Sequence, residues 1–367
     1  MTRGFSTYLD ATRAAAAIIV LLSHMAYKRF TGGDWQVIRD YNLGSDAVVI
    51  FFVLSGFVIA YAADKRDADF GAFSFSRLTR LWTVAVPALV LTLAADALGS
   101  HLAPADYDGW WHNKASAWLT APVALGFFSE WAGFGFRIGT NGPWWSLSYE
   151  AAYYLLFAIF TYMTGPRRML LLILAALLIG IKPLLLLPSW LFGVAVYHLL
   201  KSAKGPANRV RWWGYAILPI GLYGLLQSLS APLILELLGK VTFGPVMWSL
   251  RFSDEPLWNL LIGALFAWHL YAVGRLMADA NGEPGPISRA IKWIAGGSFS
   301  IYLAHYPLLM LLDVFIPDFA PALLHHLVFF GVTMIACLLF AEMFERPLPR
   351  FRTMLRRRFS RSQQVNS

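Results

Sequence analysis

Three ionisable side chains interrupt the first hydrophobic run of the sequence: Asp10, Arg13 and His24. If this run is a helix, the step from Arg13 to His24 returns to nearly the same azimuth about 16 Å further along the axis. Asp10 falls close to the same stripe, so we expect an Asp10–Arg13 pair. Ionisable groups cost about 2.5 to 3.5 kcal/mol each inside a bilayer by insertion scales, and they usually face a bundle interior or a watery cavity. The pattern therefore predicts a functional site; the structural alternative for His24 is a hydrogen bond to a neighbouring helix.

Two carboxylates lie near the ends of later apolar runs. Asp46 precedes the run FFVLSGF at 51–57, and Glu150 ends the run WSLSYE at 145–150. From their expected depth, we predict that Asp46 and Glu150 meet His24 near the outer leaflet. An unpaired carboxylate would be costly there, so Glu150 should be protonated, paired with Arg13 or a histidine, or at the edge of water.

Two further sets of polar residues follow helical spacing. Arg77 and Arg80 are i, i+3 neighbours that can present two guanidinium forks to phosphates, or can act simply as membrane anchors. Tyr302 and His305 continue a polar stripe from Ser298 in an apolar run. For Ser146, Ser148, Ser298 and Ser300, a hydrogen bond to a carbonyl of their own helix is the structural alternative to chemistry.

The composition indicates an integral membrane protein. Of the 367 residues, 58% are hydrophobic and 14% are charged, which excludes an ordinary soluble domain. The net charge of +9 does not predict nucleic-acid binding, because the basic residues fall where the positive-inside rule can use them. The single cysteine, Cys337, lies in an apolar run, so we expect no disulfide and no metal site.

The apolar runs predict an all-α polytopic bundle of about ten transmembrane helices. Most lysines and arginines fall on one side if both termini are cytoplasmic. We expect one transmembrane domain over residues 1–345 and a basic cytoplasmic tail over 346–367, with the first span retained rather than cleaved. The tryptophans of the outer segment 102–143 fit an interfacial belt, with a sugar-stacking surface as the alternative. The predicted spans are 9–29, 43–63, 79–101, 144–163, 168–187, 188–200, 212–230, 257–277, 293–313 and 322–344.

Taken together in chain order, these motifs resemble membrane acyltransferase family 3, the bacterial O-acyltransferases that modify O-antigen, exopolysaccharide and Nod-factor sugars. The resemblance extends over the whole chain, although Val49 stands where the family often has an aspartate before FFVLSGF. The motifs that carry it are Arg13-x10-His24, FFVLSGF at 51–57, Arg77-x-x-Arg80, WSLSYE at 145–150, SFSIYLAHYP at 298–307 and FERP at 344–347.

The resemblance implies an acyl-CoA donor held from the cytoplasm, with acetyl-CoA the expected one, and a carbohydrate or lipid-linked glycan acceptor at a bacterial inner membrane. It implies that His24 is catalytic, with Arg13 in the same motif, and that Arg77 and Arg80 hold the donor. Acyl transfer needs a base for the acceptor hydroxyl, which neutral imidazole can supply. We therefore predict that His24 is the general base or an acyl carrier.

The other groups receive supporting roles in this hypothesis. Glu150 is predicted to orient His24 or to hold the acceptor, and Asp46, Tyr302 and His305 are predicted to contact the substrate. Two other classes stay open: a proton-coupled secondary transporter with Arg13, His24 and Glu150 as its relay, and a polysaccharide flippase. Consumption of acyl-CoA by purified protein would distinguish the enzyme from both.

Overall fold

The computed structural model describes residues 1–203, 209–283 and 285–355, and these residues form helices and turns with no named strand. The all-α prediction is confirmed. The longer helices are α1 (Arg3–Met25), α4 (Leu43–Lys65), α5 (Phe70–Leu102), α6 (Ala117–Gly126), α7 (Trp145–Tyr162), α8 (Gly165–Ile179), α9 (Ile181–Ser202), α10 (Arg209–Ser228), α11 (Ala231–Phe243), α13 (Pro256–Leu276), α14 (Pro286–Ala295), α15 (Ser298–Phe315) and α16 (Ala322–Phe340). The short elements are α2 (Lys28–Thr31), α3 (Val37–Asp40), α12 (Met247–Leu250), the 3-10 turns η1 (Pro104–Tyr107), η2 (Gly142–Trp144), η3 (Gly244–Val246) and η4 (Arg251–Ser253), and the π-helical turn η5 (Ala341–Glu345).

Seven helices of the described chain are long and apolar enough to cross a membrane, or eight if α10 and α11, bent by 73°, form one broken span. The multi-pass prediction is therefore confirmed, but the count differs from about ten. One reason is α8, whose 15 residues extend about 22 Å and fall short of a hydrocarbon core of about 30 Å. Of the predicted tail, residues 356–367 lie outside the described residues.

The predicted break at Pro188 between the fifth and sixth spans is wrong. The helices part at Gly180, which has a φ of +81°, and α9 runs through Pro188 without ending. Pro183 does not interrupt α9 either. It lies in the first turn of α9, where a backbone N–H has no partner within the helix. Glycine adopts positive φ without a steric penalty, so the backbone ends one helix there and starts the next.

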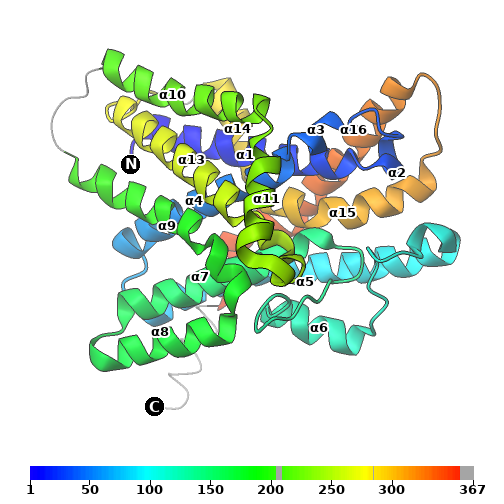
Figure 1. Cartoon of the computed structure of the whole chain (residues 1–367), viewed down its shortest axis with the longest axis horizontal. Coiled ribbons are helices and arrows are strands. Elements are labelled where there is room, and N and C mark those ends of the chain that lie inside the picture. Colours follow the sequence, from blue (N-terminus) through cyan, green and yellow to red (C-terminus); the bar gives the residue numbers. More distant parts are fainter. Residues whose placement is uncertain (204–208, 284, 356–367) are drawn as a thin grey trace. The chain divides into compact units, whose positions relative to one another are not determined.

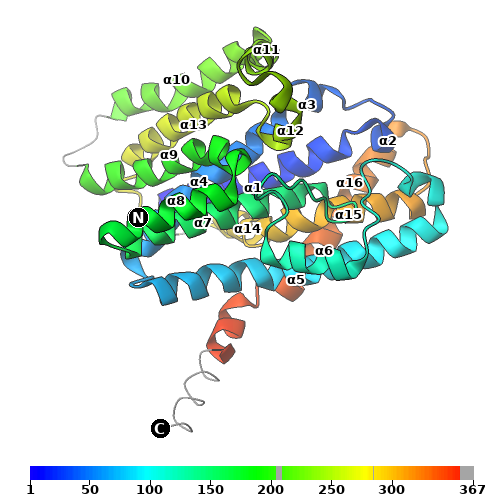
Figure 2. The same cartoon turned by 60° about the horizontal axis from the view of Figure 1, so that its bottom comes forward.

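The described residues group into two compact units, and we treat each by itself. The first contains Met1–Phe73, Phe127–Phe136 and Trp145–Ala295. Within it α4 packs against α1, α9 and α13, and α10 lies along α13 (Figure 1 and Figure 2). A buried apolar core joins these helices around Val53, Phe57 and Leu270.

Two glycines allow α4 and α9 to approach closely. A Cβ added to Gly56 would lie 2.0 Å from the Trp190 carbonyl oxygen, and one added to Gly193 would lie 1.9 Å from the Val53 carbonyl oxygen. Small residues at helix crossings are a general device of membrane bundles, because lipid supplies no hydrophobic force between helices. The glycine of the FFVLSGF run therefore serves packing.

The second unit contains Ser74–Gly126, Arg137–Trp144 and the chain from Gly296 onward. Its helices include most of α5, with α6, α15 and α16, and α15 packs on α16. The indole N–H of Trp82 in α5 donates to the Leu125 carbonyl in α6 at 3.0 Å. Of the predicted belt residues, Trp110 and Trp118 are 82% and 91% exposed, which suits either interfacial anchoring or ligand stacking.

Candidate functional site

The charged pair predicted near the start of the first span is present in α1. Arg13 Nη2 lies 2.9 Å from Asp10 Oδ1, one helical turn away. Both side chains are mostly shielded, with 27% and 21% of their surface exposed. The pair forms because α1 is helical from Arg3 to Met25, which brings i and i+3 side chains together.

His24 lies in the last turn of the same helix. Its Nδ1 is 2.9 Å from the carbonyl oxygen of Val20, four residues earlier. A carbonyl only accepts, so this contact assigns the proton of neutral imidazole to Nδ1 and the lone pair to Nε2. The arrangement suits a base whose reactive nitrogen is Nε2.

Arg39 contributes a cation to the surroundings of His24. Its guanidinium lies 3.7 Å from the ring centroid of Tyr27, and the rings of Tyr27 and His24 are 6.0 Å apart. Arg39 Nη1 also donates to the Ser23 carbonyl at 3.3 Å, at the negative end of the α1 dipole. The motifs identified in the sequence do not include Arg39.

Glu150 does not lie at the level of His24. Its Oε1 accepts hydrogen bonds from Ser55 of α4, at 3.0 Å, and from Tyr154. Helices α1 and α4 are antiparallel, since Phe5 packs on Phe57 and Ser23 meets Gly44. Ser55 is two residues from Phe57 and eleven from Gly44, which places Glu150 about 16 Å along α4 from the level of His24.

This separation corrects the expected meeting of the three groups. Glu150 lies nearer the level of Asp10 and Arg13, and the partners that it has in the described chain are neutral hydroxyls. Asp46, in the first turns of α4, lies at the end of α1 that holds His24. A direct orienting contact from Glu150 to His24 is therefore not part of this geometry.

Asp46 connects α4 to two other helices. It is 3% exposed and accepts hydrogen bonds from Tyr223 at 2.7 Å, Gln227 at 3.1 Å and the indole of Trp258 at 2.7 Å. Three donors satisfy a buried carboxylate and fix α10 and α13 on the start of α4.

A second carboxyl lies close to Asp46, outside the helices. Glu255 precedes α13 and accepts a hydrogen bond from Asn42 at 2.6 Å. Burial, followed by the charge of Asp254, raises the pKa of Glu255 to about 7. This end of the first unit therefore carries a carboxyl that changes charge near neutral pH.

A buried ion cluster fixes the segment 127–136 in the first unit. Glu130, 1% exposed, lies 3.0 Å from both Lys182 Nζ and Arg251 Nη1. The backbone N–H of Glu130 donates to Ser148 Oγ at 3.1 Å, and that hydroxyl donates to the Phe127 carbonyl at 2.7 Å. Ser148 of the WSLSYE run thus binds a distant segment, instead of its own helix as the structural alternative expected.

In the second unit, a third arginine joins the predicted donor pair. Arg77 and Arg80 lie in α5, where Arg77 Nε donates to Ser76 Oγ at 3.0 Å. Arg352 Nε donates to Thr79 Oγ1 at 2.9 Å, and its Nη2 donates to the Ser76 carbonyl. Arg352 is therefore held on the turn of α5 that carries Arg77 and Arg80.

The two C-terminal motifs meet in the second unit. Glu345 of the FERP run accepts a hydrogen bond at 2.8 Å from the backbone N–H of Ser300, in the first turn of α15. A carboxylate there satisfies a helix N-terminal donor and complements the dipole. His305 is completely buried with Nδ1 2.9 Å from the Ile301 carbonyl, and Tyr302 donates to the Pro143 carbonyl at 3.3 Å.

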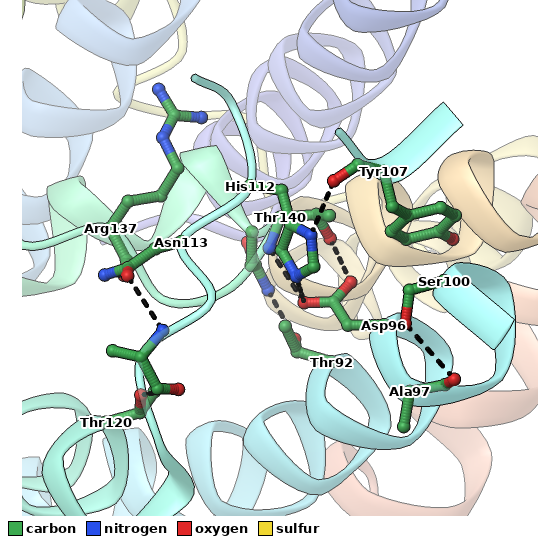
Figure 3. A network of polar contacts seen from close by, with 12 residues as sticks. Thr92, Asp96, Ala97, Ser100, Tyr107, His112, Asn113, Thr120, Arg137 and Thr140 are labelled. Atoms are coloured by element: carbon green, nitrogen blue, oxygen red, sulfur yellow. Dashed lines mark hydrogen bonds and ion pairs between the residues drawn. The ribbon is translucent and has the colours of Figure 1, made fainter. Parts of the chain in front are cut away.

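A polar network ties the segment that follows α5 back onto that helix (Figure 3). Asp96, 6% exposed, accepts from the backbone and hydroxyl of Thr140 at 2.8 and 2.6 Å. His112 Nε2 lies 3.8 Å from Asp96, and its Nδ1 lies 3.0 Å from the Tyr107 carbonyl. Asn141 donates to Thr92 at 3.1 Å.

Together, the polytopic helical fold and the partly buried Asp10, Arg13 and His24 on one helix define a membrane protein with a polar site in its first span. The family model described as an acyltransferase domain matches residues 6–342, and the chain belongs to this membrane acyltransferase family. A segment of 162 residues is 32% identical to the acyltransferase MdmB of Streptomyces mycarofaciens, covering 41% of this chain and 38% of that protein. The match thus spans well under half of that relative. No solved structure matches this chain.

Proposed function

We propose that this protein is a membrane-bound O-acyltransferase that moves an acyl group, acetyl by preference, from cytoplasmic acyl-CoA to a hydroxyl of a cell-envelope or secreted carbohydrate. The observation that carries the proposal is the contact of His24 Nδ1 with the Val20 carbonyl at 2.9 Å. It assigns the basic lone pair of the neutral imidazole to Nε2. Membership of the acyltransferase family supports the class of reaction.

In the proposed reaction, His24 Nε2 takes the proton of the acceptor hydroxyl as its oxygen attacks the thioester carbon. The carbon–sulfur bond then breaks, and the proton passes to the departing thiolate of coenzyme A. Arg39, stacked on Tyr27, adds positive charge in the region where the carbonyl oxygen becomes negative. A transient acyl group on His24 is the other form of the same hypothesis.

Arginines are proposed to bind the acyl-CoA donor. Arg77 and Arg80 hold the phosphates of coenzyme A, because a guanidinium fork matches phosphate oxygens. Arg352, held on the same turn by Thr79, is a further candidate for this role. The pantetheine arm is proposed to pass the Asp10–Arg13 pair before it reaches His24.

The remaining predicted site residues are proposed to have supporting roles in the reaction. Glu150, at the level of Arg13, is proposed to line the path of the donor rather than to orient His24. Asp46, Tyr302 and His305 are proposed to act on the acceptor only through the position of the helices that carry them, since each has a hydrogen-bond partner within the protein. The proposed location is a bacterial inner membrane with both termini cytoplasmic.

The test is acetyl-CoA hydrolysis and transfer by purified protein in nanodiscs. His24→Ala should reduce kcat by about 10²- to 10⁴-fold, the usual contribution of a general base, and should leave acetyl-CoA binding unchanged. His198→Ala, at an exposed histidine of α9, is the matched control and should keep full activity. Wild-type protein that neither binds nor consumes any acyl-CoA would overturn the proposal.

The broken span formed by α10 and α11, bent by 73°, is the observation that favours the alternative of a secondary transporter. Such helices line substrate sites in many transporters. Substrate flux into proteoliposomes without acyl-CoA would support transport. Flux that requires acyl-CoA, or no flux at all, would exclude transport as an independent activity.

A further inference from the structure

A cavity of about 310 Å³ opens in the first unit where α1 begins and α4, α9 and α13 end. Three cations line it, each from a different helix: Lys65 of α4, Lys201 of α9 and Arg275 of α13. It lies at the opposite end of α1 from His24, and none of the residues placed in the catalytic site lines it. The cavity is therefore distinct from the proposed chemistry.

The two lysines share one carboxylate. Asp64 Oδ2 lies 3.1 Å from Lys65 Nζ, and Asp64 Oδ1 pairs with Lys201. Tyr197 also donates to Asp64, at 2.6 Å. One negative charge faces two positive ones, and half or more of each lysine side chain stays exposed, 55% and 50%. Cations at helix C-termini complement the dipole, but that role does not require a cavity between them.

The wall of this cavity is aromatic. Phe57 packs edge-on against Phe5 and Tyr197, with ring centroids 5.6 and 5.7 Å apart, and Tyr61 packs on Tyr197 at 6.0 Å. All four rings line the cavity. A ligand that fits must therefore combine an anionic group for the rim with an apolar or planar body for the wall.

We propose that this cavity binds a phosphate-bearing amphiphile, with Lys65, Lys201 and Arg275 around the phosphate and the rings against its apolar part. Lysine binds phosphate as a point charge and arginine binds it as a fork. Basic pockets between membrane helices commonly receive anionic lipid headgroups. Two sources share this chemistry: an anionic phospholipid, and the nucleotide end of an acyl-CoA. The inference does not depend on the proposed function.

The experiment uses two variants that change different properties of the cavity. Lys65→Gln/Lys201→Gln removes the rim charges, and Ala278→Trp fills the cavity from an exposed lining alanine without changing any charge. Arg167→Gln/Arg168→Gln, at the start of α8 and remote in sequence from every lining residue, is the control with the same loss of charge. Thermal unfolding in detergent verifies that each variant is folded.

Binding is measured on delipidated protein with two probes, radiolabelled acetyl-CoA at equilibrium and phosphatidylglycerol by native mass spectrometry, with phosphatidylcholine as the neutral comparison. Loss of a charged hydrogen bond should weaken binding about 10- to 100-fold, and the control should stay within about twofold of wild type.

A loss of phosphatidylglycerol binding in both variants identifies a lipid site, and a loss of acetyl-CoA binding in both variants identifies a nucleotide site separate from Arg77 and Arg80. If neither probe weakens in either variant, the proposal is overturned. Wild-type protein that binds a probe, with that binding weakened in both variants, but that shows no turnover of acyl-CoA would leave this inference standing while the proposed function fails.

Discussion

Arg352 donates a hydrogen bond of 2.9 Å from Nε to Thr79 Oγ1, 273 residues earlier in the chain. The contact attaches the C-terminal part of the described chain to the turn of α5 that carries Arg77 and Arg80. Thr79 is uncharged and cannot itself neutralise a phosphate of acyl-CoA. Its role in this relationship is to fix the direction of a third guanidinium.

Thr79→Val should therefore raise the KM for acyl-CoA while kcat changes little. The loss of one hydrogen bond of about 0.5 to 1.5 kcal/mol corresponds to a two- to tenfold change in KM, and Thr79→Ser should restore the wild-type value. Steady-state kinetics over a range of acetyl-CoA concentrations measure this. An equal rise of KM in the Val and Ser variants would show that Thr79 does not act through Arg352.

Gly56→Ala should destabilise the first unit. The added Cβ would meet the Trp190 carbonyl at 2.0 Å, and overpacking of this kind costs about 1 to 3 kcal/mol or more. Gly214→Ala in α10 is the matched control, since nothing lies within 4 Å of its added Cβ. We expect a lower melting temperature in detergent for Gly56→Ala only. Equal melting temperatures would mean that α4 and α9 are further apart than described.

Glu130→Gln should be strongly destabilising, because it leaves Lys182 buried opposite a neutral group. Breaking a buried ion pair from one side costs about 3 to 5 kcal/mol. The double variant Glu130→Gln/Lys182→Met should recover part of this loss, since it removes the buried charge as well. A double-mutant cycle on chemical unfolding measures the coupling. Simple additivity of the two losses would contradict the pairing.

Glu255 should make stability depend on pH near neutrality. Its pKa of about 7 lies above the ordinary value of 4.5, so the folded protein binds more protons between these values than the unfolded chain does. The stabilisation is complete below about pH 4.5 and is lost as the pH rises through about 7.

Glu255→Gln should accordingly flatten the fall in melting temperature between pH 4.5 and 8. Asp108→Asn serves as the control, because Lys114 beside Asp108 lowers the pKa of that carboxyl, which puts its titration below this window. A wild-type profile as flat as that of Glu255→Gln would contradict the prediction.

Local geometry was predictable from the sequence, and the register between helices was not. The Asp10–Arg13 pair follows from helical spacing alone. The depth expected in a membrane, however, did not predict the position of Glu150. The axial offset of α4 relative to α1 and α9 is determined by contacts such as Phe5–Phe57 and the close approach at Gly56. Similar apolar runs can slide by several residues without changing their composition.

For some site residues, the sequence pattern favoured a different interpretation from the contact that the structure shows. Lys182 stands in an apolar run, where a buried charge predicts a partner, but nothing local identifies Glu130. Arg352 belongs to a basic C-terminal segment that the positive-inside rule already explained. Pro183 and Pro188 made the break at Gly180 hard to predict. The effect of a proline on a helix depends on whether it lies in the first turn or further along.

The single continuous helix α1 carries both the arginine proposed to face the donor and the histidine proposed to act on the acceptor. The distance between them along the helix is therefore fixed by the number of intervening residues, and motions of the other helices do not change it. Substitutions among those residues can alter the lining freely, but inserting or deleting one would turn His24 by about 100° relative to Arg13. In this protein, the number of residues between Arg13 and His24 sets the distance that the donor would have to span.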